Sequence, residues 1–215
     1  MRIKVAAIIV AAGTGTRFGG LKQLEFLEGR RIVDISLTTA RAFVDYVICV
    51  KTPGVDFGSL DADMVIDGGE TRSGSVRMGI EALPEDVEFV LVHDAARPLA
   101  SGNLYLEVLS KLEQGSRAVV PVVAVSDTVK EVEHGRVIRT PDRSRLFLTQ
   151  TPQGFSKVVL VEAHRAGLDG TDDAQLAELI GVPVDVVPGE TGNFKITTME
   201  DLERASYLLK DRIVD

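Results

Sequence analysis

Residues 3–23 read IKVAAIIVAAGTGTRFGGLKQ. The first half of this stretch is apolar and rich in β-branched residues, which is typical of a strand buried on both faces in the middle of a parallel sheet. The second half is a loop of small residues, in which Gly13 and Gly15 can adopt positive φ and turn backbone N–H groups toward an anion. Arg17 and Lys22 add positive charge beside the loop. The stretch therefore predicts a triphosphate site at the end of a central strand.

Two other glycine-rich loops are alternatives, and this sequence departs from both. A dinucleotide-binding fingerprint places its third glycine where Phe18 stands, and Asp34, the acidic residue at the right distance, lies inside a helical pattern. A Walker loop needs Gly-Lys-Ser/Thr after its last glycine, which is absent. An ordinary strand-to-helix turn remains open for the glycines alone, and the neighbouring Arg17 and Lys22 favour the anion site.

The composition is that of a globular protein, with 215 residues of which 45% are hydrophobic and 26% charged. We expect a single domain spanning residues 1–215. The net charge of −8 argues against binding to nucleic acids or anionic membranes, because both need a basic face. The lone Cys49 lies in an apolar run, which excludes an internal disulfide and predicts a buried thiol. No signal peptide or apolar span of about 18 residues is visible, so we expect a cytoplasmic protein.

Strand-like apolar runs alternate with helical patterns along most of the chain. Strands are predicted at residues 46–50, 64–66, 89–92, 118–125 and 184–187, and helices are predicted to begin near Ile32, Ser73, Ser101, Ser156, Thr171 and Met199, with Ser73, Ser101 and Thr171 as candidate caps. This alternation predicts a three-layer α/β fold around a mostly parallel, Rossmann-like sheet.

The alternation breaks between Ser126 and Thr151. Thr128–Val132 and Arg136–Arg139 follow a period of two on either side of a His-Gly turn, which predicts a β-hairpin. A hairpin of this size is not stable alone. We therefore expect residues 126–145 to form a protruding arm that packs on a second copy of the chain, making a homodimer.

Loops at the C-terminal ends of parallel strands line the ligand crevice in this fold class. Asp94 directly follows a buried apolar strand, where a carboxylate is costly unless it meets a cation or a metal. A helix cap or a pair with Arg97 would satisfy it. Beside a triphosphate loop, a Mg²⁺ ligand is the better hypothesis, because Mg²⁺ usually takes one or two carboxylates together with phosphate oxygens.

Several ordered motifs resemble those of the 2-C-methyl-D-erythritol 4-phosphate cytidylyltransferase family over nearly the whole chain. They are Ala11-Ala12-Gly13-x-Gly15-x-Arg17, Lys22-Gln23, Gly68-Gly69-x-x-Arg72-x-x-Ser75-Val76, Val92-His93-Asp94-Ala95-Ala96-Arg97-Pro98, Asp127-Thr128, Thr151-Pro152-Gln153, Thr171-Asp172 and Asn193-x-Lys195-Ile196-Thr197. The related enzymes that make CDP-ribitol share most of these motifs, so ribitol 5-phosphate remains an alternative acceptor.

The resemblance implies that CTP and a sugar-alcohol phosphate react to give a CDP-alcohol and pyrophosphate, with Mg²⁺. An anionic oxygen must then attack an anionic phosphate in line, so catalysis consists mainly of positioning and charge neutralisation. By resemblance, Arg17 and Lys22 hold the triphosphate, Lys195 contacts the α-phosphate and Asp94 binds the metal. A non-catalytic nucleotide sensor would be expected to lack Lys195 or Asp94, and a dehydrogenase would need the fingerprint that Phe18 breaks.

The remaining site residues also follow from the resemblance. It implies contacts to the cytosine base from Gly69, Glu70 and Ser75, and close backbone contacts to the nucleotide from Ala11, Ala12 and Ala95. It implies that the alcohol phosphate is held by Thr128, Arg143, Thr151 and Thr171. The chain departs from the family at Leu21, where a proline usually precedes Lys-Gln in a longer loop, and at Gly192, where many relatives carry Asp.

Overall fold

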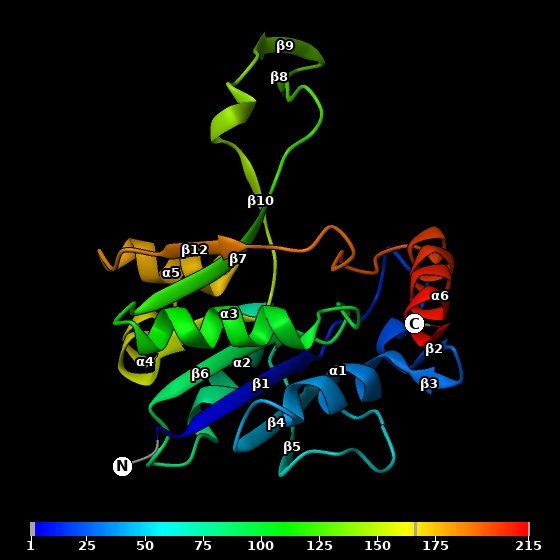
Figure 1. The fold of residues 1–215 in the computed structure, drawn as a ribbon, viewed down its shortest axis with the longest axis vertical. Coiled ribbons are helices and arrows are strands. Elements are labelled where there is room, and N and C mark those ends of the chain that lie inside the picture. The colour runs from blue at the N-terminus through cyan, green and yellow to red at the C-terminus, as the bar shows by residue number, and fades with distance from the viewer. Residues whose placement is uncertain (1–2, 166, 215) are drawn as a thin grey trace.

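The computed structural model of the protein describes residues 3–165 and 167–214. Its main sheet has eight strands in the order β10-β7-β11-β6-β1-β4-β5, and β12 also pairs with β7 (Figure 1). The strands are β1 (Val5–Ala11), β4 (Tyr46–Lys51), β5 (Met64–Asp67), β6 (Phe89–Asp94), β7 (Ala118–Ala124), β10 (Phe147–Thr149), β11 (Gln153–Ser156) and β12 (Asp185–Pro188). β1 runs parallel to β4 and β6, β4 to β5, and β12 to β7.

Helices cover both faces of the sheet, as the alternating pattern predicts. One core cluster joins the sheet to α1 (Ile32–Arg41) and α3 (Gly102–Glu113). A second cluster joins the opposite face to α2 (Arg72–Glu81), α4 (Lys157–Arg165) and α5 (Asp173–Leu179). Successive residues of β1 belong to opposite clusters: Ile9 packs in the first and Ile8 in the second, and both are fully buried. This confirms a central strand buried on both faces and a three-layer fold.

A third core cluster lies beside this sandwich. It joins α1 to α6 (Met199–Val214) and to a short ribbon of β2 (Phe26–Leu27) and β3 (Arg30–Arg31), with Leu27, Ile32 and Ile196 buried in it. Figure 1 shows α6 at one end of the sheet, next to this ribbon. The cluster places the segment that precedes α6 next to the loop that follows β1.

Three helix caps were predicted, and one is confirmed. The Ser101 side chain accepts a hydrogen bond from the Leu104 N–H at the start of α3. At α2 the cap is Thr71, whose hydroxyl accepts from the Gly74 N–H, and Ser73 lies inside the helix. At α5 the cap is Asp172, which accepts from the Gln175 N–H. The predictions for Ser73 and Thr171 were one to two residues off because several neighbouring polar side chains could all serve as caps.

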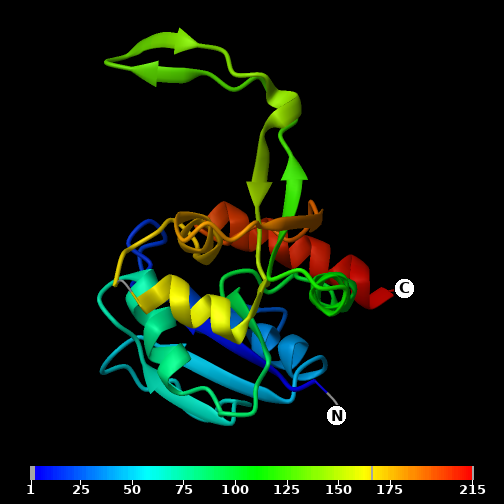
Figure 2. The ribbon, with the colours of Figure 1, turned by 90° about the vertical axis from the view of Figure 1, so that its left-hand side faces the viewer.

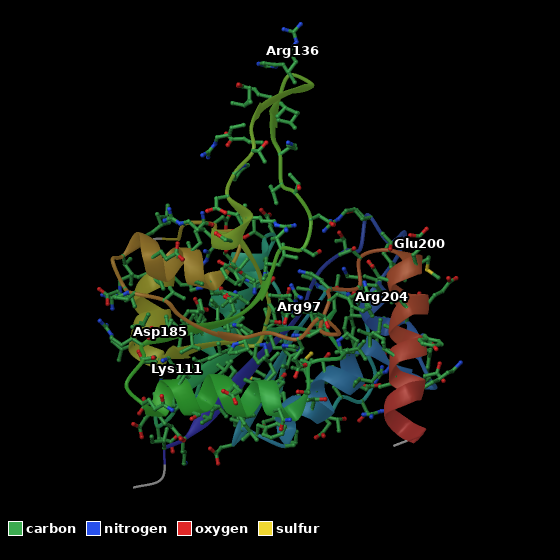
Figure 3. The ribbon with its side chains drawn as sticks, turned by 45° about the horizontal axis from the view of Figure 1, so that its top comes forward. Arg97, Lys111, Arg136, Asp185, Glu200 and Arg204 are labelled. Carbon is green, nitrogen blue, oxygen red and sulfur yellow. The ribbon has the colours of Figure 1, made fainter. Side chains whose placement is uncertain are left out.

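The break in the alternation corresponds to an antiparallel insertion and an arm. β10 pairs antiparallel with β7, and β11 lies antiparallel between β6 and β7. Between β7 and β10 the chain leaves the sheet and forms a hairpin of β8 (Glu131–Glu133) and β9 (Arg136–Arg139), followed by a short 3₁₀ turn, η2 (Arg143–Arg145). Figures 1 and 2 show this arm standing away from the rest of the molecule, and Figure 3 shows Arg136 at its far end. The predicted protruding hairpin is confirmed.

Within residues 3–165 and 167–214, no helix has both the length and the apolar character that crossing a lipid bilayer requires.

Candidate active site

The loops after β1, β5 and β6 meet at one edge of the sheet, because these strands are parallel and lie within the run β6-β1-β4-β5. A cavity of about 330 Å³, called the first cavity below, lies between them. Its lining includes every residue predicted to act on the nucleotide: Ala11, Ala12, Gly13, Gly15, Arg17, Lys22, Gly69, Glu70, Ser75, Asp94, Ala95 and Lys195. Segments from opposite ends of the sequence thus contribute to one cavity, as the motifs suggest.

The loop after β1 turns tightly at Gly15, whose φ is +67°. A Cβ at this position would lie 1.8 Å from the carbonyl oxygen of Gly20, so only glycine fits the turn. The Gly15 carbonyl accepts hydrogen bonds from the backbone N–H groups of Phe18 and Gly19, both at 2.9 Å. Gly13 was also expected at positive φ and is not. An added Cβ at Gly13 would meet no atom within 4 Å, so the backbone there is accessible from the cavity it lines.

Four cationic side chains line the first cavity: Arg17, Lys22, Arg72 and Lys195. The Lys22 ammonium donates to the carbonyl oxygen of Ile196 at 2.6 Å, which fixes it next to Lys195. Burial, together with the positive charges of Lys195 and Arg17, holds the pKa of Lys22 below its ordinary value. Cations concentrated in this way favour a polyanionic ligand, which would relieve their mutual repulsion. Although the loop before Lys22 is short, Lys22 reaches the cavity.

Asp94 lies at the end of β6, and its side chain is almost completely buried. Its Oδ2 accepts from the Lys195 ammonium at 2.6 Å, and its Oδ1 accepts from Arg72 Nε at 3.1 Å. Burial alone would raise the pKa of Asp94, but the charges of Arg72 and Lys195 outweigh it and hold the pKa well below its ordinary range. Asp94 is therefore an anion near neutral pH, held between two cations. Arg97, the partner considered from the sequence, makes other contacts.

Lys195 reaches the cavity from the irregular segment between β12 and α6, which a buried amide anchors. The Asn193 side chain donates to the carbonyl oxygen of Thr151 at 2.9 Å. The Asn193 carbonyl accepts from Arg97 Nη1 at 2.8 Å, and the Ile196 N–H donates to the Ala96 carbonyl at 2.8 Å. These bonds attach the segment to the loop after β6 on both sides of Lys195. The Asn-x-Lys motif therefore combines an anchor with the cation that it positions.

The loop after β5 approaches the cavity at Gly69 and Glu70, and α2 contributes the buried Ser75. A Cβ at Gly68 would lie 2.4 Å from the Cβ of Ala12, so the two loops touch at this point. The Ser75 hydroxyl donates to the Thr71 carbonyl at 3.0 Å. A serine inside a helix commonly makes this contact, so the hydrogen bond alone does not indicate a binding role. The position of Ser75 in the cavity lining agrees with the predicted base contact.

The four residues predicted to hold the alcohol phosphate fall into two groups. Thr151 and Thr171 line a second cavity of about 270 Å³, which shares Arg72, Asp94 and Lys195 with the first. The Thr151 hydroxyl accepts from the Asp94 N–H at 3.1 Å, and the Thr171 hydroxyl donates to Gln175 at 3.1 Å. Thr128 and Arg143 lie in the exposed arm and line neither cavity, and Arg143 donates to the carbonyl oxygen of Ser126. One chain therefore does not bring all four together.

The sequence interpretation gave no role to Arg72, which joins two buried carboxylates. Its Nη1 donates to Asp173 Oδ2 at 2.8 Å while its Nε donates to Asp94. Asp173 also lies 3.0 Å from His164 Nε2. A row of charges thus runs from Lys195 through Asp94 and Arg72, which line both cavities, to Asp173 behind them. The available signal was Arg72 in the glycine motif, but nothing in the sequence pairs it with a residue 101 positions away.

Asp94 is also the candidate metal ligand. In the part of the chain that the structure describes, no cluster of three or more His, Cys, Asp or Glu side chains could hold a metal ion. A single carboxylate fits Mg²⁺ that takes its other ligands from phosphate oxygens and water, and does not fit a metal held by protein alone. The donor set therefore fits a metal that enters with a triphosphate.

Comparison with known proteins agrees with this geometry. Residues 5–211 match the family model described as 2-C-methyl-D-erythritol 4-phosphate cytidylyltransferase. A protein of that name from Frankia casuarinae is 45% identical, over 96% of this chain and 81% of its own length. A crystal structure of the Thermus thermophilus protein of that name superimposes with a TM-score of 0.84 at 38% identity, covering 98% of this chain and 100% of that one.

Some relatives are longer. A protein of Nitratidesulfovibrio vulgaris (strain DP4) named bifunctional enzyme IspD/IspF is 45% identical over 91% of this chain, which spans 55% of that protein. The glycine loop, the converging cations and the Asn-x-Lys segment agree with the family match along nearly the whole chain. The chain belongs to the 2-C-methyl-D-erythritol 4-phosphate cytidylyltransferase family.

Proposed function

We propose that the protein transfers the cytidylyl group of CTP to 2-C-methyl-D-erythritol 4-phosphate and releases pyrophosphate, a step of non-mevalonate isoprenoid precursor synthesis. The observation that carries this proposal is the meeting of Arg17, Lys22 and Lys195 with Asp94 in one cavity. The family match favours methylerythritol phosphate over ribitol 5-phosphate as the acceptor. Lys195 and Asp94 are both present and paired, which favours an enzyme over a nucleotide sensor.

We assign the first cavity to CTP. Gly13 and Gly15 give the triphosphate a close approach to the backbone, and Arg17 and Lys22 supply compensating charge. Ala11, Ala12 and Ala95 line the cavity at the strand ends, where the nucleotide would contact them, and Gly69, Glu70 and Ser75 would surround the base. Backbone carbonyls and Glu70 suit the exocyclic amine of cytosine, which is a hydrogen-bond donor. UTP lacks this donor and would leave those acceptors unpaired.

The reaction needs no covalent intermediate with the protein. A phosphate oxygen of the acceptor attacks the α-phosphorus of CTP, a new P–O bond forms, and the bond from the α-phosphorus to the bridging oxygen breaks in line with it. Both electrons of the broken bond leave with pyrophosphate. Lys195 neutralises charge on the α-phosphate, and Arg17 and Lys22 neutralise the leaving group. Lys195 is positioned before reaction by Asp94 and by the Asn193 anchor, and Lys22 by the Ile196 carbonyl.

We propose Mg²⁺ as the cofactor, with Asp94 as its protein ligand. When bound, Mg²⁺ would withdraw charge from the phosphate oxygens of CTP. Lys195 and Arg72 each donate to one oxygen of Asp94, so each oxygen keeps a second lone pair that could face a metal. A shift of Lys195 toward the α-phosphate would expose Oδ2 further.

The acceptor is assigned to the second cavity, beside Thr151 and Thr171. Thr128 and Arg143 would complete this site from the arm of a partner subunit, because in their own chain they line neither cavity. We propose a homodimer in which the nucleotidyltransferase domain of each chain receives the arm, residues 126–145, of the other. Five exposed apolar side chains in and next to the hairpin support this: Val132, Val137, Ile138, Phe147 and Leu148.

The decisive assay is pyrophosphate release with separate substrates. CTP with methylerythritol phosphate should give rapid release, and UTP or ATP in place of CTP should lower kcat/KM strongly. Equal kcat/KM for CTP, UTP and ATP would contradict the assignment of the base site. Faster release with ribitol 5-phosphate would replace the acceptor but keep the reaction, whereas no release with either acceptor would refute the enzyme assignment.

A further inference from the structure

A fully buried carboxylate lies beyond the residues that line the two cavities. Asp173 has no exposed surface and lines neither cavity. It is placed at the start of α5, packed against α2 and α4 through two partners. Arg72 Nη1 donates to its Oδ2 at 2.8 Å, and His164 Nε2 lies 3.0 Å from its Oδ1.

The simplest interpretation is that Asp173 only holds three helices together. Two features indicate that Asp173 also affects the geometry of the active site. Arg72 uses different nitrogens for its two carboxylates, Nε for Asp94 and Nη1 for Asp173, so the plane of its guanidinium is fixed from both ends. In addition, the second cation on Asp94 is Lys195, which the proposed reaction needs on the α-phosphate.

The contacts of Asp94 would change when substrate binds. If Lys195 moves to the phosphate, Arg72 is the remaining cation on the Asp94 carboxylate. The orientation of that carboxylate then depends on Arg72, and the orientation of Arg72 depends on Asp173. Without the anion at Asp173, the guanidinium is free to rotate toward Asp94 and to take both of its oxygens.

We propose that Asp173, supported by His164, is a positioning residue that acts through Arg72 to orient Asp94 during catalysis. This inference rests on the proposed function. It predicts that loss of the Asp173 charge impairs turnover more than nucleotide binding, since Asp173 touches no substrate and the cavity for CTP stays intact.

The test compares Asp173→Asn with a matched control, Asp63→Asn. Asp63 also pairs with an arginine, Arg41 at 2.6 Å, and accepts from the Val47 N–H at 2.7 Å, but it lies outside both cavities. Melting temperature, kcat, KM for each substrate and calorimetric CTP affinity are measured for both. Asp173→Asn should lower kcat at least about tenfold, as expected for a displaced reacting group. Its CTP Kd should stay within about threefold of wild type, and Asp63→Asn should keep kcat.

A double-mutant cycle with Arg72→Lys separates positioning from simple destabilisation. A lysine keeps the charge but cannot hold two carboxylates in one plane. Arg72→Lys alone should therefore lower kcat, and the double variant should lose no more than the worse single variant, because both changes break the same linkage. If Asp173→Asn does not fold, the Arg72→Lys kcat and CTP affinity alone decide.

The inference is overturned by wild-type kcat in folded Asp173→Asn, by wild-type kcat in Arg72→Lys, or by losses that multiply in the double variant. A parallel loss of CTP affinity and kcat would make Asp173 part of the general architecture and would also overturn it. These outcomes are distinct from failure of the proposed function, in which the wild-type protein itself would release no pyrophosphate from CTP.

Discussion

In the first cavity the buried Asp94 meets a cation at each oxygen, whereas in the arm Val137 and Ile138 are 58% and 55% exposed, left uncovered by the described part of the chain. One chain supplies all the charged side chains that we assign to the triphosphate and its metal: Arg17, Lys22, Asp94 and Lys195. The arm makes its strand pairing internally and leaves its apolar side chains in solvent. Under the proposed function, the nucleotide side of the site therefore folds with one chain, and the acceptor side is completed by the arm of a second copy.

The largest effect is expected where the two cavities meet. Lys195→Ala removes the cation on the α-phosphate and leaves Asp94 with Arg72 alone. We expect kcat to fall on the order of 10²-fold or more, as when one preorganised donor is lost from a transition-state site. Steady-state kinetics and circular dichroism check this. A folded Lys195→Ala protein with near-normal turnover would remove Lys195 from the chemistry.

The arm can be tested without touching the cavity. Ile138→Asp places a charge among the exposed apolar side chains and should dissociate the proposed dimer, because a buried unpaired carboxylate is costly. Light scattering should then show monomers. These monomers should still bind CTP but turn over slowly. Arg136→Asp at the tip is the control, since it places a carboxylate outside the apolar set and changes the net charge by even more. Active monomers would show that the arm has no part in the site.

The glycine loop should respond more locally. Gly15→Ala forces a Cβ against the Gly20 carbonyl at a positive φ, so the loop must rearrange. We expect the KM for CTP to rise about tenfold, since even small misplacements of binding groups are costly. Gly20→Ala is the matched control, because an added Cβ there meets no atom within 4 Å. Equal KM values for the two variants would mean that the loop conformation does not govern CTP binding.

The smallest effect is on stability below neutral pH. Burial lowers the pKa of His93 from 6.5 to about 4, so the folded protein keeps His93 neutral where the unfolded chain binds a proton. Between those two pKa values, His93 should reduce the free energy of unfolding by at most about 1.4 kcal/mol per pH unit as the pH falls, and it should have no effect above this window. Urea unfolding of wild type and His93→Gln at pH 7 and pH 5 measures the difference. An identical pH slope in the two proteins would contradict the shift.

The sequence predicts the strands and helices in which buried apolar residues recur at a regular spacing. β1 is recognisable because both of its faces enter a core, and α3 because its cap and apolar face coincide. Four strands were missed. β2 and β3 have two residues each, β10 and β11 have three and four, and β10 is exposed throughout. The pairing of β10 and β11 with β7 and β6 joins segments separated by the arm, which no local pattern records.

The candidate site divides in the same way. Residues next to strand ends, such as Gly15 and Asp94, can be recognised in the sequence. Glycine there indicates an unusual backbone conformation, and a carboxylate after a buried strand is costly without a partner. Arg72, Asp173 and Asn193 do not stand out, because their role lies in contacts between distant segments. Thr128 and Arg143 came from family resemblance alone, and their place in a site stays a prediction.

The central claim is that each site combines the first cavity of one chain with Arg143 of the other. Equal amounts of Arg17→Ala and Arg143→Ala protein are unfolded and refolded together, and native mass spectrometry confirms that mixed dimers form. Each variant alone should be nearly inactive. A mixed dimer has one doubly damaged site and one intact site, so the mixture should regain up to about a quarter of wild-type activity, half of the dimers being mixed and half of their sites intact. Mixed dimers that form without any gain in activity would contradict the claim.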